Sequence, residues 1–207
     1  MELCHADFLV EELSMEAFLR VLVPRLVPNL TYRLHPFRGK QDLLRQLPKR
    51  LRGYAPWIGQ GYRIVVMVDR DEEDCHCLKA TLEEHAHAAG LATRSQGHDA
   101  VTVVNRIVVP ELEAWFFGDW EAVMAAYPGV PEQVPRQSRY RDPDAIEGGA
   151  WEALERILQR AGYFRSGYRK IEAAREIVEH MTPEKNRSHS FHSFRKTVLQ
   201  LAREHVT

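Results

Sequence analysis

The sequence predicts an α/β fold in which a parallel sheet is flanked by helices. Short runs rich in β-branched residues, above all residues 64–68, have the apolar character of strands that are buried on both faces. These runs alternate with segments whose apolar residues recur at helical spacing, which favours parallel strands joined by helical crossovers. With 207 residues, the chain is also long enough to bury a substantial core without disulfides.

The first predicted unit is a strand followed by a helix. Residues 7–10 form the strand, which ends in Glu11 and Glu12. Ser14 is the expected N-cap of the helix, whose apolar residues recur at helical spacing as far as Leu26. Proline residues near its end should close or kink this helix, because proline removes a backbone donor and clashes with the preceding turn.

Two further units follow with the same pattern. Residues 31–37 are a shorter strand, and leucines at helical spacing predict a helix over residues 43–51 that Pro48 breaks or kinks. The strand over residues 64–68 then leads into a third predicted helix, residues 74–89.

A fourth predicted strand covers residues 101–109, and the composition changes past Asp119. Residues 127–149 are rich in Pro, Gly, Arg and Asp and indicate a long ordered loop. Helical patterns follow over residues 151–161, 170–180 and 198–201. We therefore expect residues 1–120 to form an α/β core, with residues 121–207 as a loop and helical extension packed on it.

Composition narrows the functional classes. The formal net charge is −1, so any contact with nucleic acid must come from a local patch and not from a global basic field. Three cysteines and the lack of a signal-peptide pattern predict a cytoplasmic protein. No membrane association is expected, because no apolar run approaches the ~20 residues that cross a bilayer.

Carboxylates gather at the ends of two predicted strands. Glu11 follows the first strand, while Asp69 and Asp71 close the strand over residues 64–68, with Asp74 shortly behind. Open α/β sheets bind ligands at the carboxyl ends of their strands. A cluster of like charges favours a cation, and Mg²⁺ takes oxygen ligands together with substrate phosphates. The alternative is a solvated acidic turn that caps the next helix.

The basic residues also have two possible interpretations, one structural and one functional. The most basic segment, residues 38–52, is either a solvated helix face or a phosphate-binding flank beside the acids, with Arg38 and Lys40 as the candidate contacts. Arg187 is a further candidate for a phosphate contact because a guanidinium fork suits phosphate oxygens. Its neighbours Asn186, Ser188 and Ser190 are equally typical of a helix cap.

Two other patterns favour structural roles. Cys75, Cys77, His85 and His87 are ligand types for zinc, but residues two apart on a helix point about 200° away from each other, so neither pair can close on one ion. The aromatic run at residues 115–117 is more typical of a core than of a platform for stacking bases.

Six motifs occur in order along nearly the whole chain: L-V-E-E-L-S-M-E-A-F-L, H-P-F-R-G-K-Q-D-L-L-R-Q-L-P, V-V-M-V-D-R-D-E-E-D-C, N-R-I-V-V-P-E-L-E-A-W-F-F-G-D, Y-R-D-P-D and N-R-S-H-S-F. Together they resemble a bacterial Toprim-like family catalogued as domain of unknown function 4276. An acid closing the first strand and D-x-D closing the third resemble the Toprim fold of topoisomerases, primases and the nucleases of the overcoming-lysogenisation-defect type. The resemblance implies a Toprim-like parallel sheet flanked by helices.

The resemblance also implies roles for individual residues. Glu11 matches the strand-one glutamate, which has an acid/base or metal role, and Asp69 and Asp71 match the metal-binding D-x-D. We therefore predict Glu11, Asp69 and Asp71 as catalytic residues. The predicted metal ligands are the same three residues and Asp74, with Mg²⁺ or Mn²⁺ as the ion.

This chain departs from the Toprim pattern at two positions. Glu12 stands where the strand end usually has glycine, and Met15 stands where these nucleases often carry a further acid. Glu16 follows one residue later, but this shift rotates its side chain by about 100° on a helix. A second metal position therefore stays open among Asp74, Glu111 and Glu113.

Two functional classes follow. The resemblance implies a divalent-metal-dependent nuclease or phosphotransfer enzyme acting on nucleic acid, in phage defence together with a separate ATPase, since this sequence contains no G-x-x-x-x-G-K-[ST] loop. The alternative is a non-catalytic binding or regulatory subunit that retains the acidic pocket.

Overall fold

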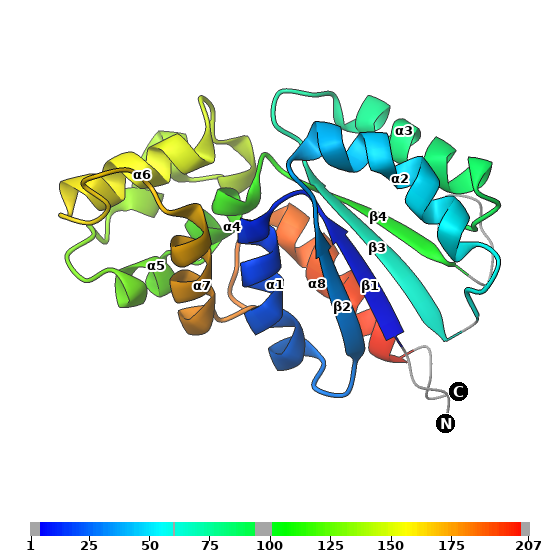
Figure 1. Ribbon diagram of the computed structural model, residues 1–207. Helices are drawn as coiled ribbons and strands as arrows, with labels where there is room; N and C mark the ends of the chain where they lie inside the picture. The colour runs from blue at the N-terminus through cyan, green and yellow to red at the C-terminus, as the bar shows by residue number, and fades with distance from the viewer. Residues whose placement is uncertain (1–4, 60, 94–100, 204–207) are drawn as a thin grey trace.

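The computed structural model, which describes residues 5–59, 61–93 and 101–203, has an α/β fold. In this described part of the chain, four parallel strands form one sheet in the order β2-β1-β3-β4. The strands are β1 (His5–Val10), β2 (Thr31–Pro36), β3 (Tyr62–Asp69) and β4 (Val103–Val108). Helices lie on both faces of the sheet (Figure 1), so the predicted fold class is confirmed.

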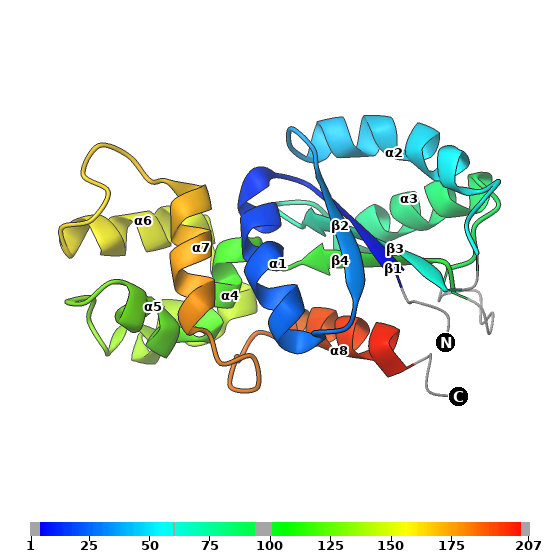
Figure 2. The same cartoon turned by 60° about the horizontal axis from the view of Figure 1, so that its bottom comes forward.

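Each face of the sheet has its own helical layer (Figure 2). One layer consists of α2 (Lys40–Tyr54) and α3 (Cys75–Ala88), and the other of α1 (Leu13–Leu26) and α8 (His189–Arg203). Because successive strand residues point to opposite faces, Phe8 and Val10 pack in the hydrophobic cluster that contains α1, whereas Leu9 packs in the cluster of α2 and α3. The sheet is therefore covered on both sides.

The remaining helices gather beside α1 (Figure 1). They are α4 (Leu112–Gly118), α5 (Trp120–Ala126), α6 (Ala150–Arg160) and α7 (Lys170–His180). Between α5 and α6 the chain forms the short 3-10 helices η2 (Val134–Arg136), η3 (Ser138–Tyr140) and η4 (Pro143–Ala145). One hydrophobic cluster joins Phe18 of α1, Trp115 of α4, Ile177 of α7 and Phe191 of α8. The C-terminal segments thus share a core with the sheet.

The N-cap predicted for the first helix is wrong, and of the two effects predicted for Pro48 the break does not occur. The N-cap of α1 is Glu12, in an extended conformation, and the Ser14 hydroxyl inside the first turn donates a hydrogen bond to the Glu12 carboxylate. Pro48 lies inside α2 without breaking it. Burial of Leu43, Leu47 and Leu51 along one face of α2 offsets the hydrogen bond that this proline removes.

Within the described part of the chain, the helices fall short of the length and apolar composition that a membrane span requires.

Candidate functional site

The sheet topology brings the acids at the ends of β1 and β3 together. These strands are parallel neighbours, with Val10 in register with Met67, so Glu11 and Asp69 leave the sheet at the same edge. Glu11 Oε2 accepts a hydrogen bond from the backbone N–H of Asp69 at 3.0 Å. Residues that are far apart in the sequence therefore meet, as strand ends of a parallel sheet should.

Asp69 carries the unusual carboxylate of this edge. Only 7% of the residue is exposed, and its Oδ1 atom has no hydrogen-bond partner among the residues that the structure describes. Burial raises the pKa of Asp69 well above its ordinary value, and the negative charges of Glu11 and Glu113 raise it further. The site therefore favours either a proton or a cation at Asp69.

The segment after β4 adds two more buried carboxylates. Hydrogen bonds from Arg70 N to Val108 O, 2.8 Å, and from Asp71 N to Pro110 O, 3.0 Å, hold this segment against the end of β3. Glu111 Oε1 accepts the N–H of Trp151 at the start of α6, at 2.8 Å. Glu113 is 1% exposed, and burial raises its pKa to about 8.

Lys170, the first residue of α7, supplies positive charge to these acids. Its Nζ atom lies 4.0 Å from Glu12 Oε1. Burial alone would lower the pKa of Lys170, but the charges of Glu113, Glu12 and Glu111 outweigh burial and raise it. Sequence reasoning missed Lys170, because its local sequence is that of an ordinary helix start and only the fold brings it to the strand ends.

A second lysine neutralises the loop after β3. Asp71 has a positive φ of 51° and an exposed side chain, and its Oδ2 lies 2.7 Å from Lys40 Nζ. The same ammonium group lies 3.0 Å from Glu73 Oε1 and donates to Arg70 O at 3.1 Å. Burial opposes the charge of Lys40, but its hydrogen bonds to Asp71 and Glu73 raise its pKa. Lys40 therefore stands beside the acidic edge as a fixed positive charge.

The remaining predicted site residues lie outside the buried cluster. Asp74 is the N-cap of α3, where its Oδ1 accepts the N–H groups of His76 and Cys77 at 2.9 Å each. The Arg187 guanidinium donates to Arg141 O at 3.2 Å and to Phe117 O at 3.3 Å, so it links three segments of backbone.

Arg38 is exposed close to the acidic edge. It lines a hollow of about 640 Å³ together with Glu12 and Lys170. Of the predicted phosphate-binding residues, Arg38 and Lys40 thus lie at the acids and Arg187 does not.

The family model for domain of unknown function 4276 (DUF4276) matches residues 10–202. The chain belongs to this family. Among solved structures, this DUF4276 chain is similar to the C-terminal region of the OLD protein of Xanthomonas campestris pv. campestris, with 16% identity, 98% of each chain covered and a TM-score of 0.48. No match is found among curated proteins.

The carboxylate oxygens of the DUF4276 acidic cluster are the type of ligand atom that a hard cation such as Mg²⁺ prefers. In the described ranges, no three side chains of His, Cys, Asp or Glu converge closely enough to form a complete metal site. However, Mg²⁺ needs only one or two carboxylates when waters and substrate phosphates supply the other ligands. Asp69 Oδ1 and Glu113 Oε1 are buried oxygens without a hydrogen-bond partner in the part of the chain that is described. A cation beside them would offset the repulsion that raises their pKa values.

Proposed function

We propose that this DUF4276 protein is a divalent-metal-dependent, Toprim-like nuclease or phosphotransfer enzyme that acts on the phosphodiester of nucleic acid. The observation that carries the proposal is the buried carboxylate of Asp69. It has an oxygen without a partner among the described residues, it lies beside Glu11 at the end of a parallel strand, and further acids surround it. A buried cluster in which acids outnumber cations is costly to fold, and perturbed carboxylates at strand ends are typical of functional sites.

Each residue at this edge has a distinct part in the proposal. Glu11 and Asp69 would hold Mg²⁺ or Mn²⁺, and the bound ion would polarise the phosphate and lower the pKa of an attacking water. Burial raises the pKa of Glu11, which favours a role in accepting and returning a proton. Lys40 would bind a substrate phosphate, and Asp71 would become available as a ligand when that ammonium turns to the phosphate.

The resemblance to Toprim families extends the proposal to a partner. The resemblance suggests a phage-defence setting with a separate ATPase, and this sequence has no phosphate-binding loop of its own. We therefore propose a separate ATPase as the partner and the cytoplasm as the site of action.

Substitution of Asp69 tests the catalytic proposal. Purified protein with Mg²⁺ or Mn²⁺ should nick DNA or RNA, and Asp69→Asn should abolish nicking because it removes the carboxylate that would bind the ion. The variant should be at least as stable as the wild type, since it also removes a buried negative charge. Asp142→Asn, the same change at an exposed aspartate outside the cluster, is the matched control. Undiminished cleavage by Asp69→Asn would remove the catalytic assignment.

A non-catalytic binding or regulatory subunit is the second candidate. It is favoured by the ion pairs that Lys40 makes with Asp71 and Glu73, which neutralise part of the acidic loop without a metal. This candidate predicts that the wild type cleaves neither DNA nor RNA, even with the partner ATPase present, while Mg²⁺ still stabilises the fold.

A further inference from the structure

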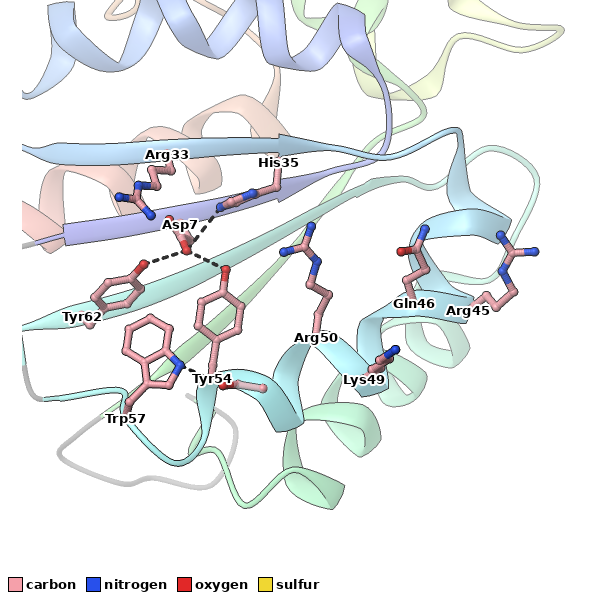
Figure 3. Close-up of a pocket in the computed structure, with 11 residues that line it drawn as sticks. Asp7, Arg33, His35, Arg45, Gln46, Lys49, Arg50, Tyr54, Trp57 and Tyr62 are labelled. Carbon is pink, nitrogen blue, oxygen red and sulfur yellow. Dashed lines mark hydrogen bonds and ion pairs between the residues drawn. The ribbon is translucent and has the colours of Figure 1, made fainter.

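A second hollow lies at the opposite end of α2 from the acidic edge. It has a volume of about 730 Å³ and lies between the C-terminal half of α2 and the strands β1 and β2. Figure 3 shows aromatic side chains at one end and basic side chains along its length. We call it the α2 groove. None of its residues belongs to the acidic cluster described above.

The floor of the α2 groove is a buried aspartate that holds the aromatic side chains in place. Asp7 Oδ2 accepts hydrogen bonds from Tyr54 Oη at 2.6 Å and from Tyr62 Oη at 2.7 Å, and His35 Nε2 lies 3.3 Å from the same atom. Burial opposes the charge of Asp7, but the nearby His35 ring and the hydrogen bonds from Tyr54 and Tyr62 hold its pKa well below the ordinary value. Asp7 is thus saturated with donors and serves as an anchor, not as a ligand for the groove's occupant.

The aromatic end of the α2 groove presents one exposed indole. Trp57 is 57% exposed, although its ring centroid lies 5.3 Å from that of Tyr54 and 5.1 Å from that of Tyr62. Its Nε1 also donates to Gly53 O at 2.8 Å. A single exposed apolar residue is ordinary on a protein surface. This indole, however, is fixed by neighbours on one side and open on the other, as a stacking platform for a flat aromatic ligand must be.

Three cations of the α2 groove lack an acidic partner among the described residues, whereas a fourth, Arg45, pairs with Asp42. Arg33, Lys49 and Arg50 are exposed, and in the ranges that the structure describes none of them forms an ion pair with a carboxylate. Arg50 instead lies over the ring of Phe37, 5.9 Å from its centroid. Since the whole chain has a formal charge of −1, this is a local positive patch of the kind that contacts phosphates.

We propose that the α2 groove binds single-stranded nucleic acid, with one unpaired base stacked on Trp57 and the neighbouring phosphates on Arg33, Lys49 and Arg50. Aromatic stacking beside a cationic track is how proteins hold single strands without reading their sequence. A duplex keeps its bases stacked on each other, so it cannot offer a base to Trp57. The groove thereby specifies the substrate class of the proposed nuclease, and in this respect the inference rests on the proposed function.

Helix α2 connects the groove to the acidic edge. Lys40 at its start contacts Asp71, and Tyr54 at its end contacts Asp7. At 1.5 Å per residue these two ends are about 21 Å apart. This distance corresponds to about six nucleotides at the 3.4 Å spacing of a stacked strand. A strand that keeps this stacked spacing and occupies both places is therefore longer than about six nucleotides, with Arg45 exposed along the way.

Fluorescence anisotropy in EDTA tests the groove without any cleavage. The probes are a labelled 12-nucleotide oligo-dT, the same length of duplex DNA, and unlabelled dTMP as a competitor. We expect wild-type protein to bind the single strand more tightly than the duplex, and dTMP to compete only weakly. Trp57→Ala should weaken binding of oligo-dT about 5- to 150-fold, which is the effect of losing one stacked base. Trp57→Phe should restore most of the affinity because it retains a stacking ring.

The charge component is measured by the salt dependence of the same binding. Arg33→Gln and Lys49→Gln should each weaken binding and each reduce the slope of log K against log salt by about 0.7, as expected for one lost phosphate contact on a single strand. Arg160→Gln, at an exposed arginine at the end of α6, is the matched control and should leave both quantities unchanged. Thermal melts of all variants confirm that each is folded.

Several results would overturn the inference. They are unchanged affinity in Trp57→Ala, duplex binding as tight as that of the single strand, and dTMP binding as tight as that of the oligonucleotide, which would indicate a site for free nucleotides. The experiments distinguish failure of the proposed nuclease activity from failure of the proposed groove. Binding that depends on Trp57 without cleavage in Mg²⁺ removes only the nuclease, whereas cleavage that depends on Asp69 but not on Trp57 removes only the groove.

Discussion

Asp69 combines a position at the end of a parallel strand with a buried carboxylate. It closes β3, its N–H is bonded to Glu11, and its own Oδ1 lacks a partner within the part of the chain that the structure describes. An unpaired buried carboxylate costs folding free energy unless it is neutralised by a proton or a cation. Such a local cost, at the edge where parallel sheets bind ligands, makes Asp69 a candidate for a functional role.

Replacing Glu113 by glutamine tests the charge of this cluster by its effect on stability. The folded protein raises the pKa of Glu113 to about 8, so it binds this proton more tightly than the unfolded chain, in which the pKa is near 4.5. The stabilisation is therefore complete below about pH 4.5 and is lost as the pH rises through about 8. Glu113→Gln should resemble the wild type near pH 5 and exceed its stability above pH 8, by on the order of a few kcal/mol. Urea unfolding in EDTA from pH 5 to pH 9 measures this difference.

The control for this profile is Glu147→Gln. Glu147 is an exposed glutamate before α6 and makes no hydrogen bond or ion pair within the ranges that are described. Its replacement should leave the pH profile of the wild type. Lys170 stays charged throughout this range because its pKa is raised. A Glu113→Gln profile parallel to the wild type at every pH would mean that Glu113 titrates normally.

The sequence anticipated part of this cluster. The meeting of Glu11 with Asp69 could be expected, because a buried β-branched run identifies a strand and parallel strands end at one edge. Lys170 could not be expected, since its place depends on how α7 packs against α1, about 160 residues along the chain. Asp74 could not be assigned from the sequence, because an aspartate that caps a helix and one that binds a metal occur in similar sequence patterns. Its hydrogen bonds to the N–H groups of His76 and Cys77 show that it caps α3.

At the scale of elements, the motifs Y-R-D-P-D and N-R-S-H-S-F contact each other at the start of α8. Asp144 lies in Y-R-D-P-D, and its Oδ2 accepts the N–H groups of His189 and Ser190, at 2.7 and 3.1 Å, in the first turn of α8. Its Oδ1 accepts the Ser188 hydroxyl at 2.6 Å. The motif N-R-S-H-S-F thus contains the capped start of a helix that packs on the sheet. A negative charge there also complements the helix dipole.

Loss of this cap should be measurable. Asp144→Ala removes three hydrogen bonds from the start of α8, and we expect it to lower the free energy of unfolding by about 2 kcal/mol. In a chain of this size, that corresponds to a melting temperature lower by about 4–8 °C. Differential scanning calorimetry measures the change. Glu147→Ala removes an equal charge from an exposed position nearby and should shift the melting temperature by less than about 2 °C. Equal shifts in the two variants would show that the cap contributes nothing specific.

Elements with a strong apolar period were predictable, and element ends were not. The helix over residues 170–180 has the predicted bounds, because its buried face, Ala173, Ala174, Ile177 and Val178, follows the helical period. The start of α1 was misplaced, since Ser14 is a typical cap residue but the chain turns two residues earlier, at Glu12. Backbone geometry at the end of β1 decided this boundary, and local composition does not encode it.

At the scale of the whole molecule, the acidic edge is assembled from both halves of the chain. β1 and β3 supply Glu11 and Asp69, the segment after β4 supplies Glu113, and α7 brings Lys170. The C-terminal helices are therefore part of the site as well as of the core. Because its members come from separate elements, the site exists only in the folded state, so that an ion bound there must stabilise the whole fold.

A divalent ion should therefore raise the melting temperature. Mg²⁺ or Mn²⁺ at about 100 times its Kd stabilises a folded protein by about 2.7 kcal/mol, provided that it does not bind the unfolded chain. For this chain length, that corresponds to about 5–10 °C. The shift is measured against NaCl of equal ionic strength, which screens surface charges but does not occupy a specific site. Asp69→Asn should lose most of the shift, because the amide cannot replace the ligand charge, whereas Asp142→Asn should retain it. A shift of equal size in wild type and Asp69→Asn would place the ion elsewhere on the protein, and Asp69 would then be a buried acid held by a proton alone.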